Sequence, residues 1–287
     1  MLTPAFRMAR FLPEAVDSVL AQDVQCLEYT VLDGGSDDGT VELLRSYGTR
    51  VSWRSEKDAG AADALRRGFA ESNGSILGWL NADDILLPGA LGSVLAAFQA
   101  HPGAVAVYSG GWWVEEDGRR LKPYPVSAEA AAQLGRECLI CQPACFFRAD
   151  AYRACGGIDA SLRSAFDYEL WMRLSRLGAF LHVPGEWALS RMHASNKSLG
   201  NRGEVFREAM EALDRHYDYV PFQWVYASLL HERDNRDQFF EELRPSLAAY
   251  ARSLPAGLLR NRHHPLCYIK EWGSQMSWAG LRRRLGR

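Results

Sequence analysis

The sequence predicts an α/β fold in which helices flank an open, doubly wound sheet, with a helical extension at the C-terminal end. Short apolar runs typical of strands alternate with amphipathic helical patterns from the start of the chain to about residue 200. After Asn201 the apolar spacing is helical. Four prolines are expected to break these helices: Pro221, Pro245, Pro255 and Pro265. We therefore expect two domains, residues 1–200 and 201–287.

The composition is ordinary for a globular protein. Of the 287 residues 47% are hydrophobic and 24% charged, and the net charge of -2 argues against a general nucleic-acid binder. No apolar stretch approaches the roughly 18 to 20 residues that span a bilayer. The N-terminus also lacks a signal-peptide pattern. We therefore expect a cytoplasmic protein.

Six cysteines are few for this length and lie in apolar surroundings, so we expect reduced thiols. Cys138, Cys141 and Cys145 are close enough in sequence to suggest a metal site, but no second tight pair accompanies them. Because the surrounding run is typical of a core strand, a zinc or iron–sulfur site is the weaker alternative.

The expected elements alternate along the chain because the apolar spacing switches repeatedly between the helical period and short continuous runs. In the first half they are a helix over 7–21, a strand over 27–32, a helix over 41–47, a strand over 51–53, a helix over 61–72, a strand over 75–80 and a helix over 89–99. In the second half they are a strand over 105–108, a hairpin over 112–121, a strand over 139–147, helices over 148–154 and from 166, and strands over 180–183 and 187–192.

A glycine-rich loop follows the strand over 27–32 and runs from Asp33 to Thr40. Glycines let a backbone approach a ligand closely, and an Asp at a strand end accepts hydrogen bonds from a ribose or base. The loop therefore predicts a phosphate or nucleotide site, although it is neither a dinucleotide fingerprint nor a P-loop. A plain glycine-rich turn is the alternative.

The acidic turn Asn81-Ala82-Asp83-Asp84 follows the apolar run over 75–80. Ligands of open α/β sheets bind outside the carboxyl ends of the strands, so these carboxylates are predicted to face a ligand crevice. Asn and Asp also favour turns and helix caps, and Pro88 follows soon after, so a strand-to-helix turn is the alternative.

Five blocks follow one another along the chain: residues 3–6 with 18–22, residues 31–40, residues 55–60 with 63–68, residues 78–84, and residues 156–157 with 167–171. In this order and spacing they resemble family 2 glycosyltransferases. The resemblance covers about residues 1–200. It implies a GT-A fold, which is a single Rossmann-like mixed sheet flanked by helices. It also implies an enzyme that takes a sugar from a nucleoside diphosphate sugar, with UDP as the expected nucleotide, and transfers it to a saccharide or lipid-linked acceptor.

The resemblance implies site residues position by position. The nucleotide-binding residues would be Thr3, Pro4, Phe6, Asp33, Asp58, Asp63, Arg67, Asn81 and Ala82. The acceptor or sugar side would hold Asp84, Gln142, Tyr168 and Trp171.

The resemblance also implies a metal. Asn81-x-Asp83 occupies the place of the family's D-x-D element, so Asp83 would bind Mn²⁺ or Mg²⁺, hard cations that prefer oxygen ligands. His193 matches a further metal or diphosphate contact, and the alternative is a structural histidine at a strand end. Asp167 matches the catalytic base of inverting members, and the alternative is an acidic helix start.

The sequence departs from the family pattern at several positions. Few apolar residues precede Thr3, so the first strand is expected to be nearly absent. Residues of other types stand where the family commonly has Asp, Asn or His: Gly34, Arg66, Asn81, Gly111 and Gln142. These departures bear on the sugar specificity more than on the reaction.

Residues 255–287 are basic, with seven Lys and Arg residues and one Glu, and they carry Tyr268, Trp272 and Trp278. This composition predicts peripheral contact with an anionic membrane surface. A solvated basic face or a contact within an oligomer is the alternative.

Two other functions fit parts of the pattern. A non-catalytic sugar-nucleotide or glycan-binding module would keep the fold, and Asn81, Gly111 and the nearly absent first strand favour it. A sugar nucleotidyltransferase shares the carboxylates but needs a glycine-rich basic loop in its opening segment, which Arg7 and Arg10 alone do not make.

Overall fold

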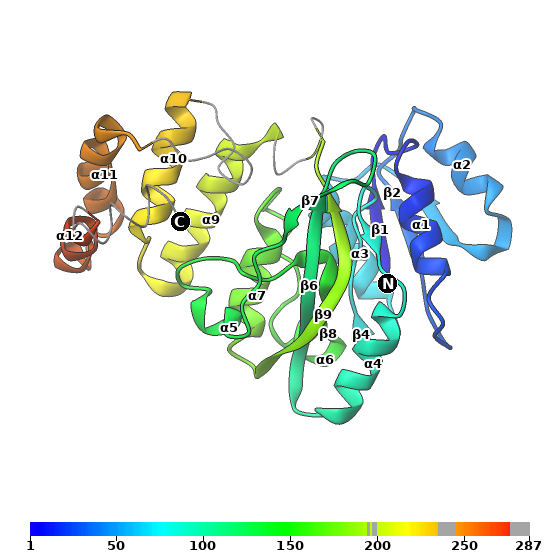
Figure 1. Cartoon of the computed structure of the whole chain (residues 1–287). Coiled ribbons are helices and arrows are strands. Elements are labelled where there is room, and N and C mark those ends of the chain that lie inside the picture. Colours follow the sequence, from blue (N-terminus) through cyan, green and yellow to red (C-terminus); the bar gives the residue numbers. More distant parts are fainter. Residues whose placement is uncertain (194–195, 197–199, 235–244, 276–287) are drawn as a thin grey trace. The chain divides into compact units, whose positions relative to one another are not determined.

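The computed structural model describes residues 1–193, 196, 200–234 and 245–275. The chain divides into two compact units. The first comprises Met1–Leu134 and Cys138–Asn196, and the second comprises Gly135–Glu137 and Lys197–Arg287. Figure 1 labels the elements of both. The assignment of residues 1–200 and 201–287 as functional domains stays a prediction.

The N-terminal part of the first unit is a three-stranded parallel sheet in the order β1-β2-β3. Its strands are β1 (Leu2–Ala5), β2 (Thr30–Asp33) and β3 (Ser52–Ser55), and its helices are α1 (Leu12–Leu20), α2 (Thr40–Ser46) and α3 (Ala61–Glu71). The expectation of a nearly absent first strand is wrong, because all four residues of β1 pair with β2.

The second ladder is mixed and has the order β4-β8-β6-β9-β5, with β7 paired to β6. Its strands are β4 (Ile76–Leu77), β5 (Ile85–Leu86), β6 (Ala104–Val114), β7 (Arg120–Pro123), β8 (Cys145–Arg148) and β9 (Ala179–Arg191). Strand β8 is antiparallel to β4 and β6, whereas β9 is parallel to β6.

Main-chain contacts at Leu2 join the two ladders. Leu2 forms a parallel bridge with Trp79, its amide donates to the Gly78 carbonyl at 3.1 Å, and its carbonyl accepts from the Leu80 amide at 3.0 Å. The two ladders therefore form one continuous mixed layer, and the predicted fold class is confirmed.

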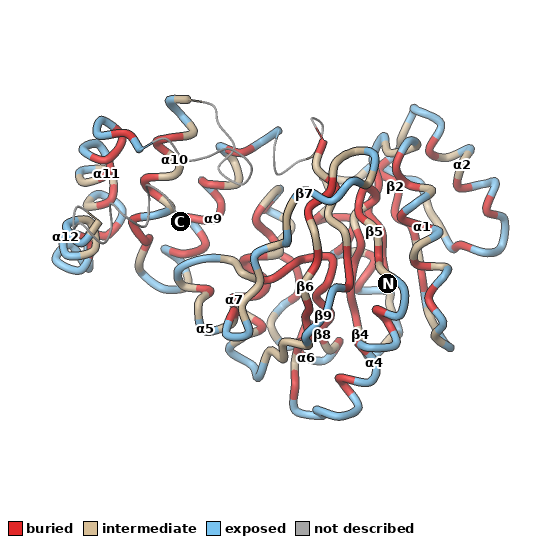
Figure 2. Tube along the Cα trace, in the orientation of Figure 1, coloured by how far each residue is buried: buried red, intermediate tan, exposed pale blue. Residues whose placement is uncertain are grey.

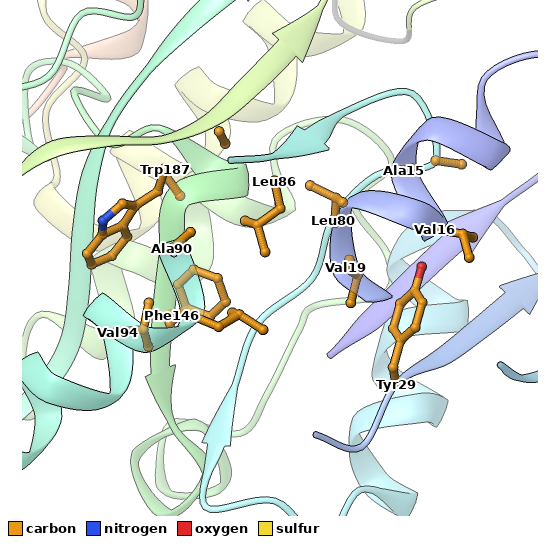
Figure 3. Close-up of a cluster of buried hydrophobic side chains, with 14 of the residues drawn as sticks. Ala15, Val16, Val19, Tyr29, Leu80, Leu86, Ala90, Val94, Phe146 and Trp187 are labelled. Carbon is orange, nitrogen blue, oxygen red and sulfur yellow. The ribbon is translucent and has the colours of Figure 1, made fainter. Parts of the chain in front are cut away.

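Helices cover both faces of the parallel strands. Val31 and Leu32 point to opposite faces because side chains alternate along a strand. Val31 packs in a core with α1, whereas Leu32 faces α3, where a Cβ on Gly68 would lie 2.7 Å from it. Figure 3 shows the core on the α1 side, with Val16 and Val19 of α1 in one cluster with Tyr29 and Leu80. Figure 2 shows the buried strands beneath exposed helix surfaces.

The first unit contains further helices and 3-10 turns. They are the 3-10 turns η1 (Gly48–Arg50) and η2 (Gln142–Ala144) and the helices α4 (Ala90–Ala100), α5 (Ala130–Gln133), α6 (Ala149–Ala154) and α7 (Phe166–Leu174).

Three strand predictions need correction. The strand expected over 75–80 is only β4, followed by the bridge at Trp79. The strand expected over 139–147 begins at Cys145, because Pro143, which has no N–H, lies in η2. The two strands expected after 180 are one strand, β9, because β6 pairs with it on both sides of residues 183–185, and the extra residues of β9 take up the register shift between Tyr108 and Gly110.

The second unit is helical among its described residues. Its helices are α9 (Arg202–Tyr217), α10 (Phe222–Asp234), α11 (Leu247–Arg260) and α12 (Pro265–Ser274). Pro265 begins α12 as expected, but the predicted break at Pro255 is wrong, because α11 continues through it. The carbonyl that loses its partner there belongs to Ala251, which is exposed to solvent.

Over the described residues, the structure contains no helix with both the length and the apolar character needed to cross a bilayer.

Candidate functional site

The predicted ligand-binding segments lie at one edge of the sheet. Strands β1, β2 and β3 are parallel, and the segment at Trp79 is parallel to β1. Because β8 is antiparallel to both β4 and β6, and β9 is parallel to β6, the end of β9 lies at this same edge. The glycine-rich loop, the acidic turn and His193 therefore follow strands that end together.

Asp33 organises the glycine-rich loop from the end of β2. It is buried, and its carboxylate accepts hydrogen bonds from the amides of Gly35 at 3.1 Å and Ser36 at 3.0 Å. The hydroxyls of Ser36 and Ser55 donate to it at 2.5 Å. A contact of Asp33 with a base or ribose stays a prediction, and the loop conformation that such a contact needs is already set by these four donors.

The loop after β1 is held against the glycine-rich loop. The Arg7 side chain pairs with Asp37 at 2.7 and 2.8 Å, and the Ala9 amide donates to Asp38 at 3.1 Å. Phe6 stands beside this contact with 53% of its surface exposed, and the Arg7 guanidinium lies over its ring at 5.3 Å from the centroid. Thr3 is fully buried with its hydroxyl 3.0 Å from that of Tyr29.

Thr3 thus supports the core beneath β1, and Pro4 is buried with it. Contacts of either residue with a base stay predictions. Phe6 is the exposed aromatic side chain of this loop.

Asp58 lies against the glycine-rich loop. Its carboxylate accepts from the Gly60 amide at 2.8 Å, and a Cβ on Gly34 would lie 3.1 Å from its Oδ2 atom. A side chain at position 34 would therefore press on Asp58. This contact is a physical reason for glycine at a position where the family often has a second Asp.

Asp63, in the first turn of α3, binds two arginines. Arg66 donates to one oxygen at 2.8 Å, and Arg67 donates to the other. Burial alone would raise the pKa of Asp63, but the hydrogen bonds from Arg66 and Arg67 outweigh it and hold the pKa below its usual value. Asp63 therefore fixes two guanidinium groups near the start of α3.

The acidic turn is built by amide side chains. The Asn81 side-chain amide donates to Asp84 at 3.0 Å and to the side-chain oxygen of Gln142 at 2.9 Å. Gln142 in turn donates to the Trp79 carbonyl at 3.0 Å. Ala82 is buried in the core. Asn81, Asp84 and Gln142 are thus brought together, with Gln142 orienting Asn81.

Asp83 and His193, which are 110 residues apart, meet at this turn. The Nε2 atom of His193 lies 3.0 Å from the Oδ2 atom of Asp83, and both residues are buried. Asn196 lies beside them, with its side-chain amide 3.4 Å from the same Asp83 oxygen. The Phe11 ring packs on the imidazole at a centroid distance of 4.5 Å.

Asp84 differs from Asp83 in its surroundings. Burial, together with the neighbouring charge of Asp83, raises the pKa of Asp84 to about 8. Its oxygens accept from the Arg191 amide at 3.0 Å and from Asn81. At neutral pH Asp84 therefore adds less negative charge to the turn than an exposed carboxylate would.

The Asp83–His193 pair fits a divalent cation that is shared with a substrate. Two ligand atoms adjacent in an octahedral shell are about 3 Å apart when each bond is about 2.1 Å. Over the described part of the chain, no three or more His, Cys, Asp or Glu side chains form a metal-binding group. Two protein ligands suit Mn²⁺ or Mg²⁺ completed by phosphate oxygens and water, and do not suit a structural zinc site.

Asp167 is positioned by the packing of α7 on the strand that precedes the acidic turn. Trp171 stacks on Trp79 at a centroid distance of 5.7 Å, and Phe166 lies 5.9 Å from the same ring. Asp167 follows Phe166, and its carboxylate accepts from the Tyr168 amide at 2.7 Å. The start of α7 is therefore held beside the segment that leads into Asn81.

Tyr168 and Trp171 face the interior. Both are buried, and the Tyr168 hydroxyl donates to the Leu134 carbonyl. In this structure their contacts hold α7 in place, and a direct role toward an acceptor stays a prediction.

Arg191 is the site residue that the sequence analysis missed. It is fully buried, and its side chain donates to the Asp83 carbonyl at 3.0 Å. The available signal was a lone cation in the apolar run 187–192, which was assigned simply to a strand.

All six cysteines are free thiols as expected.

Comparison with known proteins identifies the family. The family model described as Glycosyl transferase family 2 matches residues 1–156. A chondroitin synthase of Escherichia coli is 25% identical over 232 residues, which are 76% of this chain and 33% of that protein. A hyaluronan synthase of Pasteurella multocida is 28% identical over 203 residues, 70% of this chain and 21% of that protein. The chain thus spans a third or less of the length of these relatives.

Solved structures share the fold. S. aureus TarS 1-349 in complex with UDP-GlcNAc has a TM-score of 0.61 and 14% identity, over 96% of this chain and 90% of that one. The mannosyltransferase PcManGT from Pyrobaculum calidifontis, in complex with GDP-Man and Mn²⁺, has a TM-score of 0.57 and 15% identity. The match covers 98% of this chain and 76% of that one. With more than half of its length matched by the family model, the chain belongs to glycosyl transferase family 2.

Proposed function

We propose that this chain is a metal-dependent, inverting glycosyltransferase. It would transfer a sugar from a nucleoside diphosphate sugar, with UDP as the expected nucleotide, to a hydroxyl of a saccharide or lipid-linked acceptor. The family match and the relatives that assemble polysaccharides support this proposal. We place the reaction in bacterial polysaccharide or glycolipid assembly at the inner face of the plasma membrane.

The observation that carries the proposal is the buried Asp83–His193 pair at the edge where the glycine-rich loop also lies. Nucleotide binding is assigned to Asp33, Asp58 and Phe6 with the guanidinium of Arg67. A Mn²⁺ or Mg²⁺ ion bound by Asp83 and His193 would offset the charge that develops on the leaving diphosphate.

Asp167 is assigned as the general base. A carboxylate at this place accepts the proton of the acceptor hydroxyl while the hydroxyl oxygen attacks the anomeric carbon. The hydrogen bond from the Tyr168 amide to one carboxylate oxygen fixes the side chain. Attack from the side opposite the leaving diphosphate inverts the configuration.

The decisive experiment compares Asp83→Ala with the native chain in calorimetric titrations of UDP with and without Mn²⁺. The native chain should bind UDP more tightly with Mn²⁺, and D83A should lose this gain, because it removes the carboxylate of the pair. Asp23→Ala, which changes an exposed Asp outside the site, is the matched control. An unchanged Mn²⁺ effect in D83A would remove Asp83 as the metal ligand.

One observation favours a second candidate, a sugar-nucleotide-binding module without catalysis. Asn81, at the first position of the D-x-D element, uses its amide on Asp84 and Gln142 within the protein. Incubation of a UDP-sugar with Mn²⁺ and no acceptor separates the two functions. A transferase should release UDP slowly by hydrolysis, whereas a binding module should release none.

We further propose that the turn between α11 and α12 contacts an anionic membrane. Tyr268 is fully buried and Trp272 stacks on Tyr250, so these two aromatic side chains do not form the contact surface. In the turn itself the exposed His263 and His264 pair with the exposed Asp218. The exposed apolar and cationic side chains near the turn are Leu259, Arg260, Arg262, Leu266, Ile269 and Lys270. We call these six residues the hairpin surface. Trp278 and Arg282 to Arg284 lie outside the described residues.

A further inference from the structure

Arg191 is the most completely buried arginine at the site, with 1% of its surface exposed. Its Nε atom donates to the Asp83 carbonyl at 3.0 Å, its Nη2 atom donates to Glu14 at 2.7 Å, and its Nη1 atom donates to the Glu116 carbonyl. Its backbone amide donates to Asp84 at 3.0 Å. One residue therefore connects helix α1, the acidic turn and the hairpin between β6 and β7.

The same residue is coupled to His193. The Phe11 ring lies 5.2 Å from the Arg191 guanidinium and packs on the His193 imidazole at 4.5 Å. Asn196 donates to the Arg191 carbonyl at 2.9 Å and approaches the Asp83 carboxylate at 3.4 Å. Arg191 thus contacts Asp83 directly and reaches His193 through Phe11 and Asn196, whose backbone amide donates to the His193 carbonyl at 2.9 Å.

A buried cation beside a cation-binding pair has an electrostatic consequence. An uncompensated guanidinium would repel a divalent ion, and repulsion is strong where water is excluded. Glu14 offsets this charge from α1, with 57% of its side chain exposed. The ion pair therefore supplies hydrogen bonds to the turn and adds little net charge.

We propose that Arg191 is a positioning residue for the metal-binding pair and that Glu14 is its charge partner. The assignment of the pair to a metal rests on the proposed function. The guanidinium fixes the main chain of Asp83 so that its carboxylate faces His193, and Glu14 cancels the positive charge that would weaken cation binding. Neither residue contacts the reacting atoms in this assignment.

The first test needs no metal. Arg191→Lys keeps the charge, but one ammonium cannot reproduce the planar fork that reaches three acceptors. Hydrogen exchange of the peptide over 81–87 should be about tenfold faster in R191K than in the native chain. Arg148→Lys is the matched control, because Arg148 holds the carbonyls of Ala104 and Phe98 at the other end of β6. It should leave exchange over 81–87 unchanged.

The second test measures Mn²⁺ binding in the presence of UDP. R191K should weaken it by about tenfold to a hundredfold, the range for partners that orient metal ligands, while R148K should not. Glu14→Gln keeps a hydrogen-bond acceptor and removes the charge. It should therefore weaken Mn²⁺ binding several-fold. Hydrogen exchange over 81–87 should stay at the native rate.

The outcomes separate this inference from the proposed function. If hydrogen exchange over 81–87 in R191K is the same as in the native chain, Arg191 is not a positioning residue, whatever the Mn²⁺ affinity of the variant. Native Mn²⁺ affinity in both R191K and E14Q would overturn the link to the metal-binding pair. If the native chain binds no Mn²⁺, the metal assignment in the proposed function fails, and the exchange comparison alone decides whether Arg191 positions the turn.

Discussion

Individual carboxylates at the site have different partners, and these partners indicate different tasks. Asp33 accepts from loop amides and hydroxyls, Asp63 from two guanidinium groups, and Asp83 faces an imidazole. Asp84 is buried with a raised pKa. Asp167 lies in the first turn of α7.

Replacing Asp167 with Asn should remove the base and keep the fold. The side-chain oxygen of Asn can still accept from the Tyr168 amide, so UDP binding should stay near native. Transfer should fall by about a hundredfold to ten-thousandfold, the range for a lost general base. Asp150→Asn is the matched control, since Asp150 accepts from the Ala151 amide at 2.7 Å in the first turn of α6. Full turnover in D167N would exclude Asp167 as the base.

Asp63 should make stability depend on pH in the acid range. Its pKa is lower in the folded chain than in the unfolded chain, despite burial, because Arg66 and Arg67 donate to it. It therefore stabilises the fold above about pH 4, and this contribution is lost as the pH falls through the folded pKa. Urea unfolding between pH 6 and pH 2, as a rough range, should show a smaller loss of unfolding free energy in Asp63→Asn than in the native chain. Equal losses would contradict this role.

At the scale of elements, close contacts place the helices. Helix α7 is held by the stacking of Trp171 on Trp79, and α3 approaches β1 and β2 at Gly68. Helices α11 and α12 meet at Gly257, whose missing side chain leaves room for the buried Tyr268 ring. The Tyr268 hydroxyl donates to the Ser253 carbonyl at 2.9 Å, so this ring cannot move away freely.

Gly257→Ala should therefore destabilise the second unit. A Cβ there would lie 1.8 Å from the Tyr268 ring, and overpacking of this kind costs about 1 to 3 kcal/mol. Gly273→Ala is the matched control, because a Cβ at this helical position meets nothing within 4 Å. It should leave stability unchanged or raise it by up to about 1 kcal/mol. Thermal unfolding followed by circular dichroism should show a lower melting temperature for Gly257→Ala and not for Gly273→Ala, and equal shifts in the two variants would reject the close-packing argument.

At the scale of the whole molecule, the chain combines a GT-A sheet in the first unit with a helical second unit. The proposed site lies within the first unit. The hairpin surface lies in the second, where it exposes three large apolar side chains, those of Leu259, Leu266 and Ile269. The membrane proposal can therefore be tested without changing the site.

Native protein should bind phosphatidylglycerol vesicles and not phosphatidylcholine vesicles in a cosedimentation assay. Substitution of Arg260, Arg262 and Lys270 with Gln should weaken binding by about a hundredfold, since each cation near an anionic surface contributes about 1 kcal/mol. The same change at the exposed Arg45, Arg50 and Arg176 of the first unit is the control. An equal loss of vesicle binding in both variants would mean that only general charge attraction holds the protein on the vesicles. It would reject the proposed contact through the hairpin surface.

Much of the fold could be predicted because the signals are local. Apolar spacing indicated the order of strands and helices, and the glycine-rich loop and acidic turn follow the strands as expected. The wrong predictions of strand and helix bounds lie where the surroundings of a segment, and not its own residues, decide its structure. Strand β9 is continuous because β6 pairs with it on both sides of residues 183–185, and α11 passes through Pro255 at a place where the freed carbonyl belongs to the exposed residue Ala251.

The sequence by itself determined the family, the α/β order and the candidate carboxylates, because residue types and their spacing are local properties. The tertiary structure decided which of these side chains meet. It brought His193 to Asp83, turned Tyr168 and Trp171 inward, and placed Arg191 behind the acidic turn. Such contacts join residues more than a hundred positions apart, and only the pairing and packing of the strands bring them within hydrogen-bonding distance.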